Sequence, residues 1–143
     1  AQTQGPPKID WNSIESVTKK EFTESDIMLA KFGTAVISDV KSNAILLVST
    51  TKTGFATVGV GPGQTSRVEA VRIAARRAGD RAKGSMMISD AFFPFRDGID
   101  TANEIGVESI VQPGGSMRDS DSITAADEHD MSMIFTNRRL FLH

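Results

Sequence analysis

The sequence contains no cysteine, one tryptophan and two histidines. Without cysteine, the chain can form no disulfide, no thiolate nucleophile and no cysteine-bound zinc site. His129 and His143 are the only residues that could supply an imidazole, so catalysis by a serine–histidine pair has few candidates. We therefore expect no metal site in this chain.

Long hydrophobic runs are also missing. The longest apolar stretch is residues 44–48, whereas a membrane-spanning helix needs ~18 or more apolar residues. The amino end shows no basic segment followed by an apolar one, which is the pattern of a secretory signal. We expect a soluble, cytoplasmic protein that makes no use of a membrane.

The charges are nearly balanced. Sixteen lysines and arginines face eighteen aspartates and glutamates, which gives a formal net charge of −2. A chain without an overall positive field is not expected to bind nucleic acid, so any anion site must be local. Its length of 143 residues and 39% hydrophobic content fit one domain with a single core.

The first part of the chain predicts a lead-in, a helix and a β-hairpin. Gly5, Pro6 and Pro7 resist regular structure, so we interpret residues 1–16 as a flexible lead-in or linker and residues 17–143 as the folded unit. Thr23 precedes an acidic first turn, as at a helix start. Two short apolar runs separated by a turn then predict a hairpin, with strands at residues 43–50 and 55–60.

After the hairpin, helices and strands alternate. Residues 66–83 contain apolar side chains at spacings of three and four and form the most secure helix. Alternating strands and helices indicate an α/β fold: a mixed sheet with helices on both faces, in three α/β/α layers. The further strands are expected at residues 85–90, 108–112 and 132–135, and the further helices at 98–105 and 120–129.

Residues 59–67 (GVGPGQTSR) form a glycine-rich turn between a strand and a helix. Backbone N–H groups in such a turn can approach an anion or a flat ligand, and Gln64 and Arg67 could add side-chain contacts. The spacing is neither a dinucleotide fingerprint nor a P-loop. A turn that is merely tight remains an alternative, because glycine allows sharp backbone geometry whatever the function.

Residues 89–98 (SDAFFPFRDG) follow a predicted strand, at the end where α/β sheets usually bind ligands. Phe92, Phe93 and Phe95 could form a wall for a planar heterocycle, and Asp97 could accept N–H bonds from it. In the alternative reading, the three phenylalanines seal the core and Asp97 caps the next helix.

Three further segments carry weaker signals. Residues 112–119 are best interpreted as a plain strand-to-helix connection. Residues 127–130 (DEHD) have metal-ligand chemistry, but neighbouring helix positions point in different directions, so a solvated helix end is the better interpretation. Arg138 and Arg139 could pair with a phosphate or lie at the surface.

Five long segments in the same order and spacing resemble one family, the bifunctional enzymes of purine biosynthesis with AICAR transformylase and IMP cyclohydrolase activities. The resemblance covers residues 17–143 and only the carboxyl-terminal part of that family. The segments are VKSNAI at 40–45, GVGPGQTSRVEAVRIA at 59–74, SDAFFPFRDGID at 89–100, IVQPGGSMRD at 110–119 and AADEHDMSMIFTNRRLFLH at 125–143.

The resemblance implies a cytidine-deaminase-like α/β/α fold, the second of two such halves. It implies formyl transfer from 10-formyltetrahydrofolate, the co-substrate, to the 5-amino group of AICAR, as in a phosphoribosylaminoimidazolecarboxamide formyltransferase. By matching positions, Asn43 and Arg67 would bind and orient the nucleotide and the formyl group. The expected folate contacts are Gln64, Phe92 and Asp97, and the expected phosphate contact is Arg139.

The resemblance also shows what this chain lacks. The family's catalytic lysine–histidine pair lies in the first half, and here no lysine is followed by histidine. Neither His129 nor His143 matches that motif, so we assign neither a catalytic role. We expect the chain to need a polypeptide carrying the first half, or a homodimer, to complete a site. The alternative is a non-catalytic purine- or folate-binding or oligomerisation module of the same fold.

Overall fold

The computed structural model describes residues 9–63 and 65–137. Every helix and strand expected from the sequence is present, with bounds that differ by a few residues. In chain order the elements are α1 (Glu24–Ile37), β1 (Ile45–Thr51), β2 (Gly54–Gly61), α2 (Arg67–Ala78), a short 3-10 helix (Gly79–Ala82), β3 (Met86–Ser89), α3 (Asp97–Glu104), β4 (Ser109–Gln112), α4 (Asp119–Glu128) and β5 (Ser132–Phe135).

The strands form one mixed sheet of five in the order β2-β1-β3-β4-β5. Strand β1 pairs antiparallel with β2 and with β3, whereas β3, β4 and β5 are parallel. Thr51 pairs with Gly54 across a two-residue loop, so the predicted hairpin is confirmed. The α/β class with a mixed sheet is confirmed as well.

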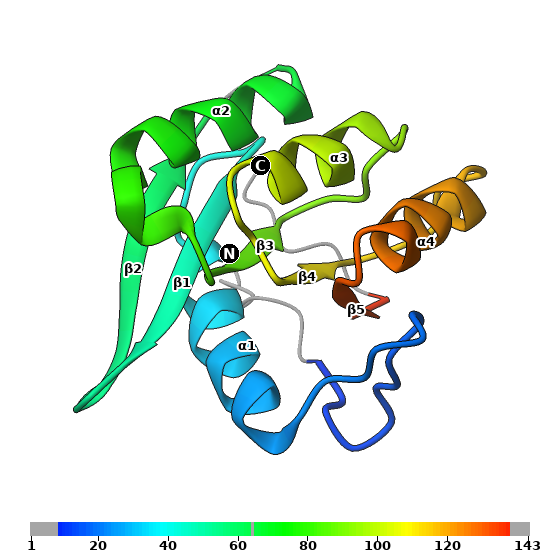
Figure 1. The fold of residues 1–143 in the computed structure, drawn as a ribbon, viewed down its shortest axis with the longest axis horizontal. Helices are drawn as coiled ribbons and strands as arrows, with labels where there is room; N and C mark the ends of the chain where they lie inside the picture. Colours follow the sequence, from blue (N-terminus) through cyan, green and yellow to red (C-terminus); the bar gives the residue numbers. More distant parts are fainter. Residues whose placement is uncertain (1–8, 64, 138–143) are drawn as a thin grey trace, which may run out of the picture.

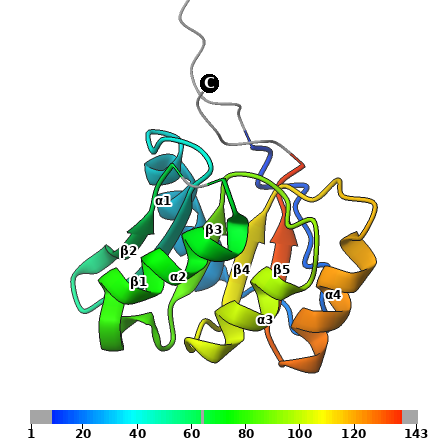
Figure 2. The ribbon, with the colours of Figure 1, turned by 90° about the horizontal axis from the view of Figure 1, so that it is seen from above.

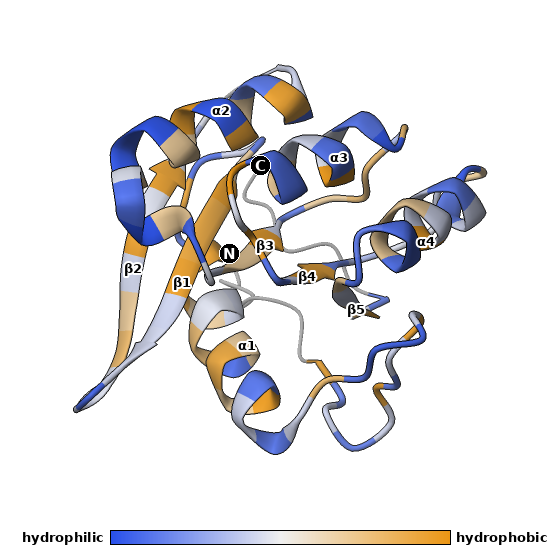
Figure 3. Ribbon diagram, viewed as in Figure 1, coloured by the Kyte–Doolittle hydropathy of each residue, from blue (hydrophilic) through white to orange (hydrophobic). Residues whose placement is uncertain are grey.

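Helices lie on both faces of the sheet. Helix α1 covers one face, and α2, α3 and α4 cover the other (Figure 1). Successive residues of a strand point to opposite faces, so β1 contributes Leu46 and Val48 to the core under α1 and Ile45 and Leu47 to the core under α2. The middle strands are accordingly coloured as hydrophobic over most of their length, while each helix carries hydrophilic stretches (Figure 3).

Helix α1 begins where the sequence predicts. Its N-cap is Thr23, whose side chain accepts the backbone N–H of Asp26 at 3.1 Å, and the Asp26 carboxylate accepts the Thr23 N–H at 2.9 Å. This capping box satisfies two backbone donors that the helix itself leaves free. Gly33 lies inside the helix because a Cβ there would come within 2.6 Å of the Ile88 side chain, so glycine lets the helix approach β3.

The segment before α1 is packed against the core where the structure describes it. Trp11 and Ile14 contact the core cluster under α1. Ser16 bridges to Ile134 of β5, and the Val17 N–H donates to the Met133 carbonyl at 2.9 Å. Composition predicted a flexible lead-in up to residue 16. Trp11 and Ile14 lie before that boundary, and both are packed against the core.

Helix α2 ends earlier than its apolar pattern predicts. The α-helix stops at Ala78, and Gly79 has a φ of +59°, a conformation that favours glycine. A short 3-10 helix continues to Ala82.

Among the described residues, no helix is both long and apolar enough to cross a membrane.

Two glycines of the glycine-rich turn allow α2 to pack directly on the backbone of β2. A Cβ on Gly59 would overlap the Ala74 carbonyl oxygen, and a Cβ on Gly61 would overlap the Ala70 carbonyl oxygen. Both obstacles are helix backbone, which cannot move aside as the end of a flexible side chain can. These glycines therefore serve close packing, which supports the tight-turn reading for this part of the motif.

We predict that Gly61→Ala lowers the free energy of unfolding by about 3 kcal/mol, at the upper end of the usual overpacking penalty, because α2 must move away from β2. Ser120→Ala is the control: Ser120 is an exposed position inside α4, so this change should alter the free energy of unfolding by less than about 0.5 kcal/mol. Urea denaturation of both variants measures the difference. An equal or smaller loss for Gly61→Ala would contradict the packing argument.

Candidate functional site

The segments at residues 59–63, 89–98 and 112–119 emerge at one edge of the sheet, here called the carboxyl edge, where β2 to β5 end and β1 begins. Ile45 at the start of β1 pairs with Ser89 at the end of β3 and with Gly61 at the end of β2. The parallel strands β4 and β5 end at the same edge (Figure 2). Ligands of open α/β sheets commonly bind at such an edge.

A buried carboxylate, Asp90, lies at the centre of this edge, directly after β3. Its side chain has no exposed surface, and its Oδ1 forms an ion pair with Nη1 of Arg67 at 2.6 Å. Its Oδ2 accepts the backbone N–H of Ala44 at 2.9 Å. A buried charge is tolerated only when it is paired and hydrogen-bonded, and Asp90 satisfies both conditions.

Arg67 and the residue after Asn43 both contact this carboxylate. Arg67 is the first residue of α2, directly after the N-cap Ser66, and its side chain is 11% exposed. Asn43 immediately precedes Ala44 and is partly buried. Arg67 and Ala44, the neighbour of Asn43, therefore contact the same residue, Asp90, to which sequence reasoning had assigned no role.

The phenylalanine segment does not form one wall. Phe93 is fully buried in the core, and a Cβ on Gly98 would overlap its ring, so glycine makes room for it. Phe95 is 54% exposed, with the Arg118 guanidinium 5.5 Å from its ring centre. Phe92 is partly buried. The expectation of a three-phenylalanine wall is wrong for Phe93, which seals the core as the alternative reading held.

The end of β4 holds this loop in place through Gln112. The side chain is fully buried, and its Oε1 accepts the backbone N–H of Phe93 at 3.3 Å. Its Nε2 lies 3.3 Å from the Met133 sulfur. Gln112 thus ties the loop after β3 to the interior of the sheet.

Asp97 is the first residue of α3 and is exposed. Its Oδ1 accepts the backbone N–H of Gly98 at 2.8 Å, a contact within the first turn of its own helix. Carboxylates are favoured at this end of a helix because of the free N–H groups and the helix dipole. The N-cap of α3 is Arg96, which makes no side-chain capping bond, so Asp97 is not the cap that the alternative reading assigned to it, and its carboxylate is exposed in the first turn.

The turn after β4 is a plain connection, as the sequence predicts. The Asp119 carboxylate accepts the backbone N–H groups of Gly115 at 2.8 Å and of Ser116 at 3.0 Å. The donors that could have met an anion are therefore occupied by a side chain of the same loop. Gln64 and Arg139 lie outside the residues that the structure describes.

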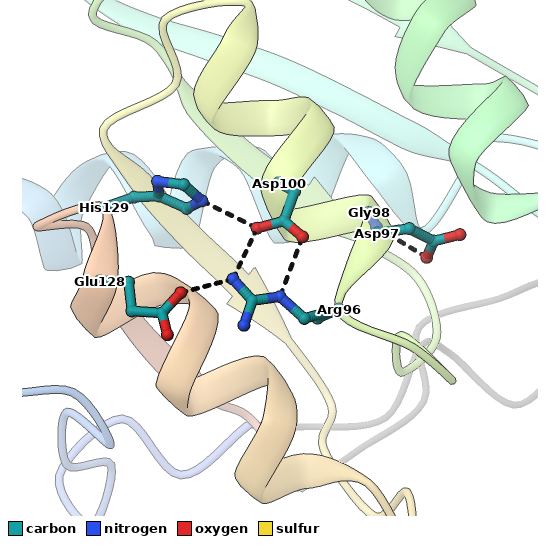
Figure 4. A network of polar contacts seen from close by, with 6 residues as sticks. All are labelled: Arg96, Asp97, Gly98, Asp100, Glu128 and His129. Atoms are coloured by element: carbon teal, nitrogen blue, oxygen red, sulfur yellow. Dashed lines mark hydrogen bonds and ion pairs between the residues drawn. The ribbon is translucent and has the colours of Figure 1, made fainter.

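A second polar network joins α3 to α4, and sequence reasoning missed it. The Arg96 guanidinium contacts both oxygens of Asp100, at 2.9 and 3.0 Å, and Glu128 at 2.6 Å (Figure 4). Nε2 of His129 lies 2.8 Å from Asp100. The helix end at residues 127–130 is thus engaged by α3, and no metal-binding cluster occurs in the described parts of the chain.

The network changes the acidity of its members. The hydrogen bonds from Arg96 lower the pKa of Asp100 and of Glu128, and the two carboxylates raise the pKa of Arg96. In Asp100, partial burial opposes this effect and the His129 contact adds to it. Both carboxylates are therefore ionised throughout the neutral range, and the network stays intact there.

We predict that Asp100→Asn lowers the free energy of unfolding at pH 7 by about 1 kcal/mol or less, since water screens these partly exposed charges. The pKa of Asp100 in the folded chain lies below its ordinary value of 3.8. Its ionised form therefore stabilises the fold above that value, and the contribution is lost as the pH falls through the lower, folded-state pKa.

Urea denaturation at pH 7 and at pH 2 to 3 measures this difference. The gap between wild type and Asp100→Asn should shrink at the lower pH. Asp39→Asn is the matched control, because Asp39 is exposed and takes part in none of the ion pairs among the described residues. A gap that is the same at both pH values would show that the Asp100 charge is not the cause.

The chain is similar in sequence to proteins of one family. The family model described as the AICARFT/IMPCHase bienzyme matches residues 1–77. The bifunctional purine biosynthesis protein PurH of Chelativorans sp. (strain BNC1) is 46% identical over 151 aligned positions, which cover 99% of this chain and 27% of that protein. PurH of Shouchella clausii (strain KSM-K16) is 46% identical over 134 positions, which cover 94% and 25%.

The chain thus spans about a quarter of the length of these two relatives. Among solved structures, Acinetobacter baumannii RibD, form 2, aligns with a TM-score of 0.47 and 15% identity over 76% of this chain and 32% of that one. The family model covers more than half of the 143 residues, and the aligned relatives carry the same bifunctional description. The chain belongs to the AICARFT/IMPCHase bienzyme family.

Proposed function

We propose that this chain supplies part of an AICAR transformylase site, with contacts to the nucleotide and to 10-formyltetrahydrofolate. The observation behind the proposal is that the candidate residues lie along the carboxyl edge. Asn43, Arg67, Phe92 and Asp97 come from three separate segments, and all of them lie along that edge. Membership of the family supports assigning these residues the roles that the resemblance implies.

The chemistry sets the requirements for such a site. The amine of AICAR attacks the formyl carbon, the bond from that carbon to the folate nitrogen breaks, and a proton lost by the amine is balanced by one gained at that nitrogen. A catalyst must hold two planar reactants in contact and stabilise the negative oxygen of the tetrahedral intermediate. Proton transfer must also be assisted.

The described residues suit the binding part of this task. The Arg67 guanidinium carries N–H donors besides the Nη1 group used by Asp90, and the Asn43 amide can both donate and accept. In the proposal they orient the nucleotide and the formyl group. Phe92 offers apolar surface beside the folate, and the exposed Asp97 carboxylate accepts N–H bonds from its aminopyrimidine ring. Gln64 and Arg139 are proposed contacts to the folate and the phosphate.

Proton transfer is assigned to a partner. The chain contains no lysine followed by histidine, and His129 faces Asp100 in the network between α3 and α4. We therefore propose that a polypeptide carrying the first half of the transformylase, or a second subunit of a dimer, completes the site. In this proposal residues 17–143 form a cytidine-deaminase-like half, and the protein acts in the cytoplasm.

Formyl transfer tests this proposal directly. AICAR and 10-formyltetrahydrofolate are mixed with this chain alone, with the chain plus a polypeptide carrying the lysine–histidine half, and with that half alone, and tetrahydrofolate formation is followed by absorbance. We expect activity only in the mixture. Activity of the chain alone would contradict the assignment of proton transfer to the partner, and a folded, associated but inactive mixture would favour a binding module.

A point variant tests the nucleotide contact. Asn43→Ala should lower the affinity for AICAR in the mixture about tenfold or more, because a ligand polar group loses its hydrogen-bond partner. The control is Asn103→Ala, which removes the same side chain from an exposed position on α3 and should leave affinity unchanged. Isothermal titration calorimetry measures both. Equal affinities would remove Asn43 from the site.

A further inference from the structure

The Asp90 side chain makes polar contacts with two other segments of the chain, and close packing alone would not require such contacts. It is fully buried, yet each of its two carboxylate oxygens contacts a different segment of the chain. Oδ1 meets the Arg67 guanidinium of α2 at 2.6 Å, and Oδ2 accepts the Ala44 N–H before β1 at 2.9 Å. The Asp90 N–H also donates to the Ala44 carbonyl at 3.3 Å. One side chain therefore connects the ends of three elements.

Stability alone gives little reason for a charged pair at this position. The loss of hydration of two buried charges offsets much of their attraction, and well-packed apolar residues often stabilise a fold as well. What an ion pair does specify is direction. The hydrogen bond from a guanidinium N–H to a carboxylate oxygen is directional, which an apolar contact is not.

Direction matters for Arg67 because its side chain is long and has several rotatable bonds. Fixed at Nη1, the guanidinium loses the freedom to turn away, and its 11% exposed surface stays at the carboxyl edge. The Ala44 contact acts on the other side, since it fixes the backbone next to Asn43. One residue thus constrains the positions of both residues that are proposed to contact AICAR.

We propose that Asp90 is the positioning residue of this site: one carboxylate oxygen directs Arg67, and the other fixes the backbone that carries Asn43. The inference rests on the proposed function for the identity of the ligand. The arrangement itself exists without ligand, so it can be measured separately from AICAR binding.

The test uses Asp90→Asn, which keeps the shape and an acceptor for Ala44 but removes the charge. Glu69→Gln is the matched control, since it removes a carboxylate from α2, the helix that carries Arg67, at an exposed pair with Arg76. In the free chain, nitrogen-15 relaxation of the Arg67 side chain should report a rigid guanidinium in wild type and in Glu69→Gln. It should report a mobile one in Asp90→Asn.

Binding gives the second measurement. In the mixture with the first half, Asp90→Asn should lower the affinity for AICAR about tenfold or more, because a charged donor is no longer held in place. Glu69→Gln should bind within about twofold of wild type. Amide spectra of each variant establish that it is folded. A folded Asp90→Asn with a rigid Arg67 and wild-type affinity would overturn the proposal.

The outcomes separate the two proposals. If wild type does not bind AICAR but Arg67 is rigid and becomes mobile in Asp90→Asn, the proposed ligand is wrong and the positioning role stands. If Asp90→Asn does not fold, the wild-type chain still tests the inference, because a mobile Arg67 guanidinium in the free wild-type chain contradicts it. Tight AICAR binding together with a mobile Arg67 would retain the function and remove the role of Asp90.

Discussion

A carboxylate without access to water must find its hydrogen bonds and its counter-charge inside the protein, and at the end of β3 this requirement determines how several segments meet. Asp90 satisfies it with Arg67 from α2 and Ala44 from the segment before β1. Neither segment can shift without leaving a buried charge unpaired, which is far more unfavourable than losing a surface contact. Electrostatic interactions, together with packing, therefore determine how the segments are arranged at the carboxyl edge.

The position of Arg67 also depends on how closely α2 approaches the sheet. Helix α2 lies on the backbone of β2 because Gly59 and Gly61 have no side chains to hold it away. A helix further out would carry Arg67 away from Asp90, beyond the range of an ion pair. The glycine-rich turn thus contributes to the site indirectly. Its glycines set the distance of α2 from the sheet, and α2 sets the position of the Arg67 guanidinium.

Much of this could be predicted from the sequence, because the signals are local. The hairpin follows from two apolar runs around a turn, and the start of α1 follows from Thr23 and Asp26. The partners of Asp90 could not be predicted, since they lie 23 and 46 positions away and no periodic pattern connects them. Likewise, composition could not separate buried Phe93 from exposed Phe95, because the difference comes from tertiary contacts such as that of Phe93 with Gly98.

A comparison of two arginine–aspartate pairs shows how the surroundings decide what the same ion pair does. Arg67 and Asp90 are sheltered from water, so their geometry is narrowly fixed at the carboxyl edge. Arg96 and Asp100 are 40% and 35% exposed, so water weakens their attraction. Their network instead joins α3 to α4 through Glu128. Because α3 begins at Asp97, that network also holds the helix whose first residue is the exposed aspartate proposed to contact the folate.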